Sequence, residues 1–262
     1  LKCRNDTKIG YITLNSPETL NSLTLNMVNE ISKLLDKWEA NPQIKMIIMD
    51  GSGDKAFCAG GDIRALYESM CSAEGPIFAE TFFESEYRLD YKLHNFPKPI
   101  ISIIDGIVMG GGAGLMFGSS FKISTERTKF AMPEIGVGLF PDVGFTSVIK
   151  DLPEGLGLYI MLTSTQLNAA DTLFCNLTDC SLSSEDLEKF FQEIQEIEWK
   201  DMKKGNLKIL KSIVHQDGYT NKLNNFPKSK LKDELSNIQS LTNASNLHEV
   251  AKNIMSNQSN DE

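Results

Sequence analysis

An apolar stretch of twenty residues, Pro99 to Gly118, most restricts the possible folds of this chain, because its composition resembles that of a membrane span. Its single charge is Asp105, and glycines stand at positions 106, 110, 114 and 118. An aspartate in the middle of a membrane helix costs about 2.5 to 3.5 kcal/mol on insertion scales, and a glycine triplet would weaken a lipid-exposed helix. We therefore predict a buried strand at Ile100 to Ile104, then a turn, then a helix that packs through small residues, and no membrane segment.

The first half of the chain alternates short apolar runs with segments of helical periodicity. Strands are predicted at Lys8 to Leu14, Ile44 to Met49, Ile100 to Ile104 and Phe121 to Thr125, and helices at Thr24 to Ala40, Ile63 to Met70 and Pro76 to His94. Strands separated by helices indicate β-α-β units and a mostly parallel sheet. The expected fold class is α/β.

After about Gly155 the strand patterns fade and helical patterns replace them. Helices are predicted at Ser183 to Ile197, Lys230 to Gln239 and Asn246 to Ile254, and the first begins with Ser-Ser-Glu-Asp, which is typical of a helix N-cap with an acidic first turn. We expect a core over residues 1–180 and a helical region over residues 181–262.

Composition and charge narrow the class of protein. Hydrophobic residues make up 41% and charged residues 23%, as in ordinary soluble proteins, and 26 Lys and Arg against 35 Asp and Glu give a net charge of −9. This acidic balance argues against nucleic acid or anionic lipid as the main partner, although a local basic pocket for a phosphorylated ligand is compatible with it.

Five scattered cysteines without a C-x-x-C pair, and three distant histidines, predict no zinc or other metal site and a reducing compartment. Because the chain starts at Leu1 and not at Met, we expect the natural N-terminus and any targeting peptide to lie upstream.

A first glycine segment, Phe57-Cys58-Ala59-Gly60-Gly61-Asp62, stands between a predicted strand and a predicted helix. Its two glycines allow backbone N–H groups to approach a ligand closely. The simpler interpretation, favoured for this segment alone, is a turn in which Asp62 caps the following helix. Cys58 has no His, Asp or Lys base beside it, so we interpret it as a small buried thiol and not as a nucleophile.

A second glycine segment runs from Gly106 to Gly114, between a predicted strand and a predicted helix. It places unpaired amides and the positive end of a helix dipole where an anion or oxyanion could bind. Leu115 stands where the third glycine of a dinucleotide-binding fingerprint should be, which excludes that motif. Gly114 and Gly118 can serve close helix packing while Gly111 serves a site.

Two carboxylates, Glu134 and Asp142, stand eight residues apart in the apolar, glycine-punctuated run from Met132 to Gly144. Such surroundings desolvate carboxyl groups, raise their pKa values and can give the two groups different roles. The alternative is two loop carboxylates that face water.

A third carboxylate, Glu86, falls in a helical segment among apolar residues. It lies within a stripe formed by Phe78, Phe82, Leu89 and Leu93, where a carboxylate is unfavourable unless it is paired or functional. A different stripe, through Phe83 and Tyr87, would leave Glu86 at its edge, and periodicity does not choose between the two.

In order and spacing these segments resemble the crotonase (enoyl-CoA hydratase/isomerase) superfamily, from about Gly10 to Asn176. The resemblance implies a ββα spiral core and an oxyanion hole in which the amides of Gly61 and Gly111 hold the carbonyl oxygen of an acyl-CoA thioester. Hydratases of this superfamily typically carry one glutamate just after the glycine triplet and another in a Pro-Glu pair. Here the first position is Gly114 and the second is Glu134.

Within the superfamily, the segments around Gly61 and Glu134 are most similar to the 3-hydroxyisobutyryl-CoA hydrolase branch. The resemblance implies that Glu134 attacks the thioester carbonyl or activates water to do so, and that Asp142 orients Glu134 or the substrate hydroxyl. It implies that Glu86 contacts the acyl group and that Asp62 belongs to the substrate-binding residues with Gly61 and Gly111. Coenzyme A enters as part of the substrate, and no separate cofactor is implied.

The implied function is hydrolysis of a short branched β-hydroxyacyl-CoA thioester, as in valine breakdown. The alternatives are an enoyl-CoA hydratase or isomerase that relies on Glu134 alone, and an acyl-CoA-binding homologue without catalysis. The resemblance also implies a mitochondrial location, with the cytoplasm and the peroxisome as alternatives, and allows a homo-oligomer. It weakens after Ala169, and the final helices of the hydrolase fold are not recognised, so the chain is expected to be either truncated or divergent there.

Overall fold

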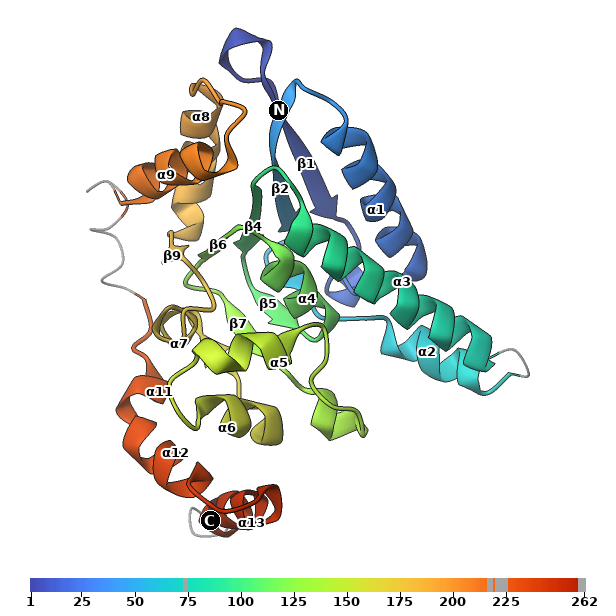
Figure 1. Cartoon of the computed structure of the whole chain (residues 1–262), viewed down its shortest axis with the longest axis vertical. Helices are drawn as coiled ribbons and strands as arrows, with labels where there is room; N and C mark the ends of the chain where they lie inside the picture. Colours follow the sequence, from blue (N-terminus) through green and yellow to red (C-terminus); the bar gives the residue numbers. More distant parts are fainter. Residues whose placement is uncertain (73–74, 216–218, 220–225, 259–262) are drawn as a thin grey trace.

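The computed structural model describes residues 1–72, 75–215, 219 and 226–258, and its core contains two β-sheets (Figure 1). The larger sheet has five strands in the order β1-β2-β4-β6-β9, and all its neighbouring pairs are parallel. Its strands are β1 (Lys8–Leu14), β2 (Ile44–Gly51), β4 (Ile100–Ile104), β6 (Phe121–Ser124) and β9 (Cys180–Ser181). The smaller sheet has the order β3-β5-β7-β8, with β7-β8 antiparallel and the other pairs parallel. Its strands are β3 (Ala56–Cys58), β5 (Ile107–Met109), β7 (Lys129–Ala131) and β8 (Leu167–Asn168).

From β2 to β7, consecutive strands alternate between the two sheets, so this part of the chain winds as a repeated strand–strand–helix unit. Strands β2 and β3 are followed by α2 (Ile63–Met70) and α3 (Gly75–Asn95), and β4 and β5 are followed by α4 (Gly111–Gly118). Strands β6 and β7 are followed by the 3-10 helix η3 (Glu134–Val137). The α/β class and the ββα spiral expected from the sequence are confirmed.

The smaller sheet is what the sequence pattern did not reveal. Its strands β3, β5 and β7 are three residues long and β8 is two, which is too short to show the alternation of a half-buried strand. The apolar stretch of residues 99–118 supplies β4, β5 and α4, so the prediction of a strand, a turn and a helix is confirmed, with β5 inserted. Within the described part of the chain, every helix is too short or too polar to cross a bilayer.

Helices make up most of the remaining chain. The first is α1 (Leu25–Glu39), which starts after its N-cap Thr24, and those of the second half are α5 (Phe145–Val148), α6 (Leu156–Thr163), α7 (Ala169–Phe174), α8 (Leu187–Gln195), α9 (Lys203–Val214), α11 (Lys230–Asp233), α12 (Leu235–Thr242) and α13 (Leu247–Gln258). Short 3-10 helices are η1 (Arg4–Asp6), η2 (Pro17–Thr19), η4 (Ile149–Asp151) and η5 (Ser184–Asp186). The prediction of one helix over residues 230–239 is wrong in detail, because the chain there divides into α11 and α12 at Glu234.

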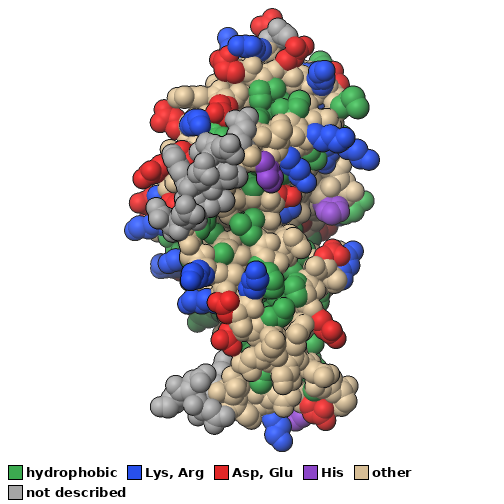
Figure 2. Space-filling view, turned by 90° about the vertical axis from the view of Figure 1, so that its left-hand side faces the viewer, with side chains coloured by type: hydrophobic (Ala, Val, Ile, Leu, Met, Phe, Trp, Pro, Cys, Tyr) green, Lys and Arg blue, Asp and Glu red, His purple; other side chains and the backbone are tan. Residues whose placement is uncertain are grey.

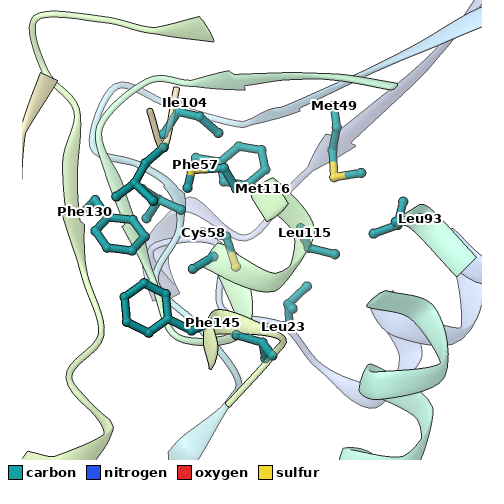
Figure 3. Packing of buried hydrophobic residues seen from close by; sticks show 14 of the residues in the cluster. Leu23, Met49, Phe57, Cys58, Leu93, Ile104, Leu115, Met116, Phe130 and Phe145 are labelled. Carbon is teal, nitrogen blue, oxygen red and sulfur yellow. The ribbon is translucent and has the colours of Figure 1, made fainter. Parts of the chain in front are cut away.

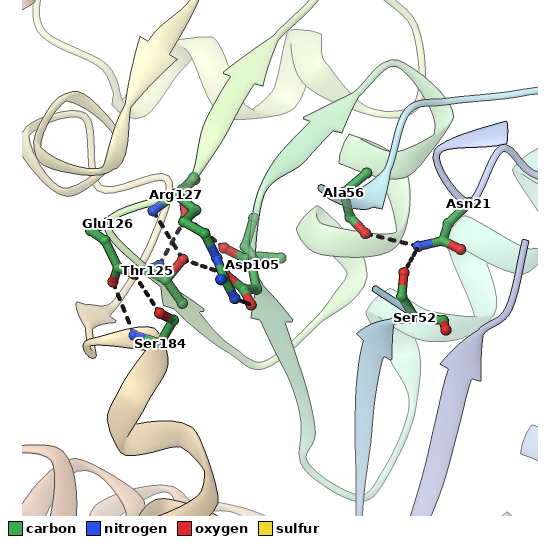
Figure 4. Close-up of polar contacts among 10 residues, drawn as sticks. Asn21, Ser52, Ala56, Asp105, Thr125, Glu126, Arg127 and Ser184 are labelled. Atoms are coloured by element: carbon green, nitrogen blue, oxygen red, sulfur yellow. Dashed lines mark hydrogen bonds and ion pairs between the residues drawn. The ribbon is translucent and has the colours of Figure 1, made fainter. Parts of the chain in front are cut away.

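The helix predicted from Ser183 begins later than expected. The backbone N–H and the hydroxyl of Ser184 both donate to the Glu126 carboxylate, so this segment is tied to the loop after β6 (Figure 4). Ser183 makes no side-chain capping bond, and α8 starts at Leu187. The expected boundary at residue 180 falls inside β9, where the Ser181 and Ser124 hydroxyl oxygens are 2.6 Å apart.

The larger sheet is buried on both faces, which explains why its strands read as continuous apolar runs. In β2, Ile47 and Met49 point into the main core with β3, α3 and α4, whose packing is shown in Figure 3. Met46 and Ile48 point to the opposite face, into a second cluster with α8 and α9. Figure 1 shows α8 and α9 on one side of the sheet and α1 and α3 on the other.

Polar contacts hold the loops that connect the two sheets (Figure 4). Asp105, the one charge of the apolar stretch, lies between β4 and β5 and accepts hydrogen bonds from the Thr125 hydroxyl at 2.7 Å and from Arg127 Nε at 2.9 Å. The fully buried Asn21 donates to the carbonyl oxygens of Ser52 and Ala56, at 3.0 and 2.8 Å. These bonds fix the start of β3 and β5, whose far ends form the site described below.

The surface carries charges of both signs. Lys and Arg side chains are interspersed with Asp and Glu on the face shown in Figure 2. Exposed pairs such as Arg4–Glu196, at 2.9 Å, each contribute about 0–1 kcal/mol, so the fold depends mainly on its core.

Candidate active site

The carboxyl ends of β3, β5 and β7 bring together segments that are far apart in the sequence. Gly61 follows β3, Gly111 follows β5 and Glu134 follows β7, each within three residues of the strand end. Because these strands are parallel neighbours, their carboxyl ends lie at one edge of the sheet. A cavity of about 110 Å³ lies there, and its lining includes Gly61, Glu86, Gly111, Glu134 and Asp142. Five of the six predicted site residues therefore meet at one cavity.

The amides of Gly61 and Gly111 face the same small space. A Cβ atom added to Gly111 would lie 3.3 Å from the Gly61 amide nitrogen. Neither amide has a hydrogen-bond acceptor among the residues that the structure describes. The Gly111 N–H is also the first of α4, where the helix dipole favours negative charge. Two such donors can hold one developing oxyanion.

The glycines before each amide are required by the backbone. Gly60 has φ +110° and Gly110 has φ +48°, values that side chains with a Cβ rarely adopt. These two turns direct the following N–H groups into the cavity and away from the strand ladder. The glycine segments predicted to bind an oxyanion thus have the local geometry for it.

Glu86 lies on the buried face of α3 and is 3% exposed. Phe82, Leu89 and Leu93 share that face, so the first of the two predicted stripes is correct. Its Oε1 has no hydrogen-bond partner among the described residues and lies 2.1 Å from the position of a Cβ on Gly111. Burial, and next the nearby charges of Asp142 and Glu134, raise the pKa of Glu86 to about 8. The group is therefore mostly a neutral carboxylic acid at pH 7.

Glu134 is the first residue of η3 and is 6% exposed. Neither of its carboxyl oxygens has a hydrogen-bond partner in the described chain, and Oε1 lies 3.1 Å from the position of a Cβ on Gly110. Burial is the main reason that its pKa rises to about 7, and the Asp142 charge adds to it. The alternative of a loop carboxylate facing water is wrong for Glu134.

Asp142 is half-buried and lies in the turn that precedes α5. The Tyr87 hydroxyl, one residue after Glu86, donates to Asp142 Oδ2 at 2.5 Å. The next residue, Val143, has φ +42°, a strained conformation for a β-branched side chain. No sequence pattern predicted the contact from α3 to this turn, because it joins residues 55 positions apart.

Asp62, the sixth predicted site residue, lies outside the cavity lining. It is the N-cap of α2, where its side chain accepts from the Ala65 N–H at 2.9 Å, so the capping interpretation is confirmed. Cys58 is fully buried and burial raises the pKa of its thiol to about 12, which fits a packing role.

Asp90 is a site-proximal carboxyl group that the sequence pattern did not single out. It lies one turn after Glu86 on α3, and both of its oxygens are buried without a hydrogen-bond partner among the described residues. A Cβ on Gly114 would lie 2.8 Å from each of these oxygens. A Cβ on Gly118 would lie 2.5 Å from the Leu93 Cβ, so the predicted packing role of Gly114 and Gly118 against a neighbouring helix is confirmed. The sequence signal that could have indicated Asp90 is its spacing from Glu86. Two like charges four residues apart on a helix are unfavourable, so such a pair indicates a special environment.

The chain is similar in sequence to enzymes that act on coenzyme A thioesters. A family model described as enoyl-CoA hydratase/isomerase matches residues 9–262. A mitochondrial 3-hydroxyisobutyryl-CoA hydrolase of Danio rerio is 35% identical over 247 residues, which is 94% of this chain and 63% of that protein. The same enzyme of Rattus norvegicus is 43% identical over 185 residues, 71% of this chain and 48% of that protein. The chain thus spans less than two thirds of the length of these curated relatives.

Solved structures agree with the fold. The structure of a carnitinyl-CoA dehydratase from Mycobacterium thermoresistibile is similar with a TM-score of 0.81 and 29% identity, over 95% of this chain and 68% of that one. An enoyl-CoA hydratase from Rhodobacter sphaeroides has a TM-score of 0.76 and 27% identity, over 97% of this chain and 72% of that one. The similarity extends over the spiral core and the helices that follow it.

Proposed function

The chain belongs to the enoyl-CoA hydratase/isomerase family, and from this premise we propose that it hydrolyses the thioester of a short β-hydroxyacyl-CoA such as 3-hydroxyisobutyryl-CoA. The observation that carries the proposal is the combination of two acceptor-free amides, of Gly61 and Gly111, with the buried, unpartnered carboxyl group of Glu134 at the same cavity. The curated hydrolase relatives support the choice of reaction, and the mitochondrial location given for them is proposed for this chain as well.

In the proposed reaction, the Gly61 and Gly111 N–H groups donate to the thioester oxygen and stabilise the negative charge that develops on it. The Glu134 carboxylate either attacks the carbonyl carbon, forming an anhydride as the C–S bond breaks, or removes a proton from the water that attacks. Coenzyme A leaves as a thiolate and takes up a proton, and water supplies the oxygen of the acid product. A single turnover in ¹⁸O-water distinguishes the routes, because an anhydride intermediate can leave label in Glu134.

The size of the cavity supports a short acyl group. Its volume of about 110 Å³ is smaller than the roughly 150 Å³ cavity that holds a benzene molecule. Neutral Glu86 lies against Gly111 and can donate a hydrogen bond to a hydroxyl on the acyl chain. A small substrate with a hydroxyl group near the thioester suits both features.

The main competing reaction is hydration of an enoyl-CoA, the activity named for the Rhodobacter sphaeroides structure. A side chain at position 114 would collide with Asp90 and with Val143, whose Cβ lies 2.9 Å from the position of a Cβ on Gly114. The place of one hydratase glutamate is thus closed here, which favours hydrolysis.

The test of the proposal is coenzyme A release, measured with a thiol reagent, from 3-hydroxyisobutyryl-CoA and in parallel from crotonyl-CoA. A sample without substrate corrects for the five cysteines of the chain itself. Thiol release with the hydroxyacyl substrate supports a hydrolase. Loss of enoyl absorbance without thiol release would establish a hydratase, and binding of acyl-CoA without either reaction would establish a non-catalytic binding protein.

The rate is expected to rise with pH through neutrality. Glu134 must be ionised to act as nucleophile or base, and burial places its pKa near 7. Below that pH the group is protonated, so kcat/KM should fall about tenfold for each pH unit on the acid side. Initial rates from pH 5.5 to 7.5 measure this fall in kcat/KM on the acid side. A rate that does not change over this range would contradict the role of Glu134.

Glu86→Ala is expected to reduce kcat/KM about tenfold for hydroxyacyl-CoA and less than about threefold for an acyl-CoA of equal length without the hydroxyl. The difference corresponds to the loss of one hydrogen bond of about 1 kcal/mol between the neutral carboxyl group and the substrate hydroxyl. Glu84→Ala on the exposed face of the same helix is the matched control and should leave both rates unchanged. An equal loss on both substrates would argue against direct contact.

A further inference from the structure

A second, larger cavity of about 660 Å³ adjoins the proposed active site. It lies between α3 and the turn of residues 140–144, and Asp142 lines both cavities. Asp90 and Val143 are part of its wall, with Gly114 between them. This wall therefore packs next to Asp142 on the side that faces away from the proposed active site.

Asp90 and Val143 approach each other across Gly114. The two Asp90 oxygens lie 2.8 Å, and the Val143 Cβ 2.9 Å, from the position that a Cβ on Gly114 would take. The absence of a side chain at residue 114 thus allows the Asp90 carboxyl group to fill the gap between α4 and the turn. Val143 is held in its strained φ of +42° directly after Asp142, and strained residues persist only where their surroundings fix them.

The carboxyl group of Asp90 is suited to this place only in its neutral form. Both oxygens are buried and unpartnered in the described chain, and the charged groups that face it are Glu86 from its own helix and Asp142 from the turn. The neighbouring helix α4 contributes no titratable side chain. Burial first, and then these two charges, raise the pKa of Asp90 to about 8.

We propose that Asp90 is a positioning residue, whose carboxyl group packs beside Gly114 against Val143 and thereby fixes the turn that presents Asp142. The role in hydrolysis rests on the proposed function, whereas the placement of the turn does not. Tyr87, which donates to Asp142 from the same helix, provides a reporter of that placement.

Three variants of the full chain test the proposal. Asp90→Asn keeps the planar shape of the neutral carboxyl group, cannot ionise, and should retain at least half of the wild-type kcat. Asp90→Ala opens the space behind Val143 and should lower kcat at least tenfold, with KM within about threefold of wild type. In an Asp142→Gly background, Asp90→Ala should have no additional effect, because its influence passes through Asp142. Wild-type activity of Asp90→Ala, equal loss in Asp90→Asn, or full additivity with Asp142→Gly would each overturn the proposal.

Two further measurements do not depend on activity. The ¹³Cζ resonance of labelled Tyr87 should move in Asp90→Ala and stay in place in Asp90→Asn, and an unmoved resonance in Asp90→Ala would overturn the proposal even if the chain hydrolyses no thioester. The melting temperature of Asp90→Asn relative to wild type should rise as the pH goes from 5 to 8. In this range Asp90 keeps its proton in the folded state and has released it in the unfolded state, so wild type loses stability as the pH rises. Asp50→Asn changes a half-buried aspartate of β2 away from the site; it is the matched control and should leave kcat and the Tyr87 resonance unchanged.

Discussion

Glu134→Gln is expected to abolish thioester hydrolysis, with kcat reduced by at least about 1000-fold, while acyl-CoA affinity changes by no more than a few-fold. Glutamine has the same shape as a protonated glutamate, so it fits the buried position where neither carboxyl oxygen has a partner among the described residues. It cannot act as nucleophile or base. Thiol release under single-turnover conditions measures the rate, and calorimetric titration with a non-hydrolysable thioether analogue measures binding.

The control for this experiment is Glu154→Gln, a change of the same chemistry at an exposed position. It should leave both rate and affinity as in wild type. Because the pKa of Glu134 is raised by burial, replacing it with a neutral side chain should not lower the melting temperature near pH 8. Hydrolysis retained in Glu134→Gln would remove Glu134 from the chemistry and leave Glu86 and Asp142 as the other carboxyl groups in the described lining of the cavity.

Gly111→Ala should reduce kcat/KM by at least about 100-fold, as much as the loss of one oxyanion-hole donor, because the added methyl group would keep the substrate oxygen away from the two N–H groups. The added methyl group would lie 2.1 Å from Glu86 Oε1 and 3.3 Å from the Gly61 amide nitrogen, so it would displace the carboxyl group and occupy the space of the substrate oxygen. Because alanine favours helices over glycine by about 1 kcal/mol, the loss of activity should not be accompanied by unfolding of α4. Steady-state kinetics and circular dichroism together separate the two effects.

Gly205→Ala in α9 is the matched control, because a Cβ there has its nearest neighbour at 3.5 Å, an ordinary contact. It should leave kcat/KM unchanged. Combining Gly111→Ala with Glu86→Ala removes the collision between the methyl group and the carboxyl group, but it should not restore the rate, since the oxyanion position stays blocked. If Gly111→Ala alone has wild-type activity, Gly111 is not an oxyanion donor.

The order of the glycine segments and carboxylates carried the family resemblance, and that resemblance implied the spiral core and six site residues, of which five meet at one cavity. Periodicity could not decide whether Glu86 is buried, because both stripes of that helix are apolar. The decision comes from tertiary packing: α4 consists of small residues at its start, and α3 approaches it closely with the Glu86 face. The local sequence pattern therefore cannot show which face of this helix is buried.

The parts that escaped sequence analysis share a physical cause. The strands β3, β5 and β7 are too short for a pattern, and their stability comes from neighbours in the sheet. The Tyr87–Asp142 bond and the packing of Asp90 beside Gly114 join distant segments, so no local signal marks them. The late start of α8 has the same origin, because Ser184 is held by Glu126 from a different part of the chain.

The winding of the chain as repeated strand–strand–helix units has a consequence for how such a protein can change its chemistry. Three successive units each contribute one position, Gly61, Gly111 and Glu134, two or three residues after the end of their second strand. These points lie after the strands and outside their hydrogen-bonded ladders, so an exchange of side chains around them can change the reaction without a new fold. The two amide donors belong to the backbone and are inherited with the scaffold, whereas the acid–base groups are side chains that can be exchanged one unit at a time.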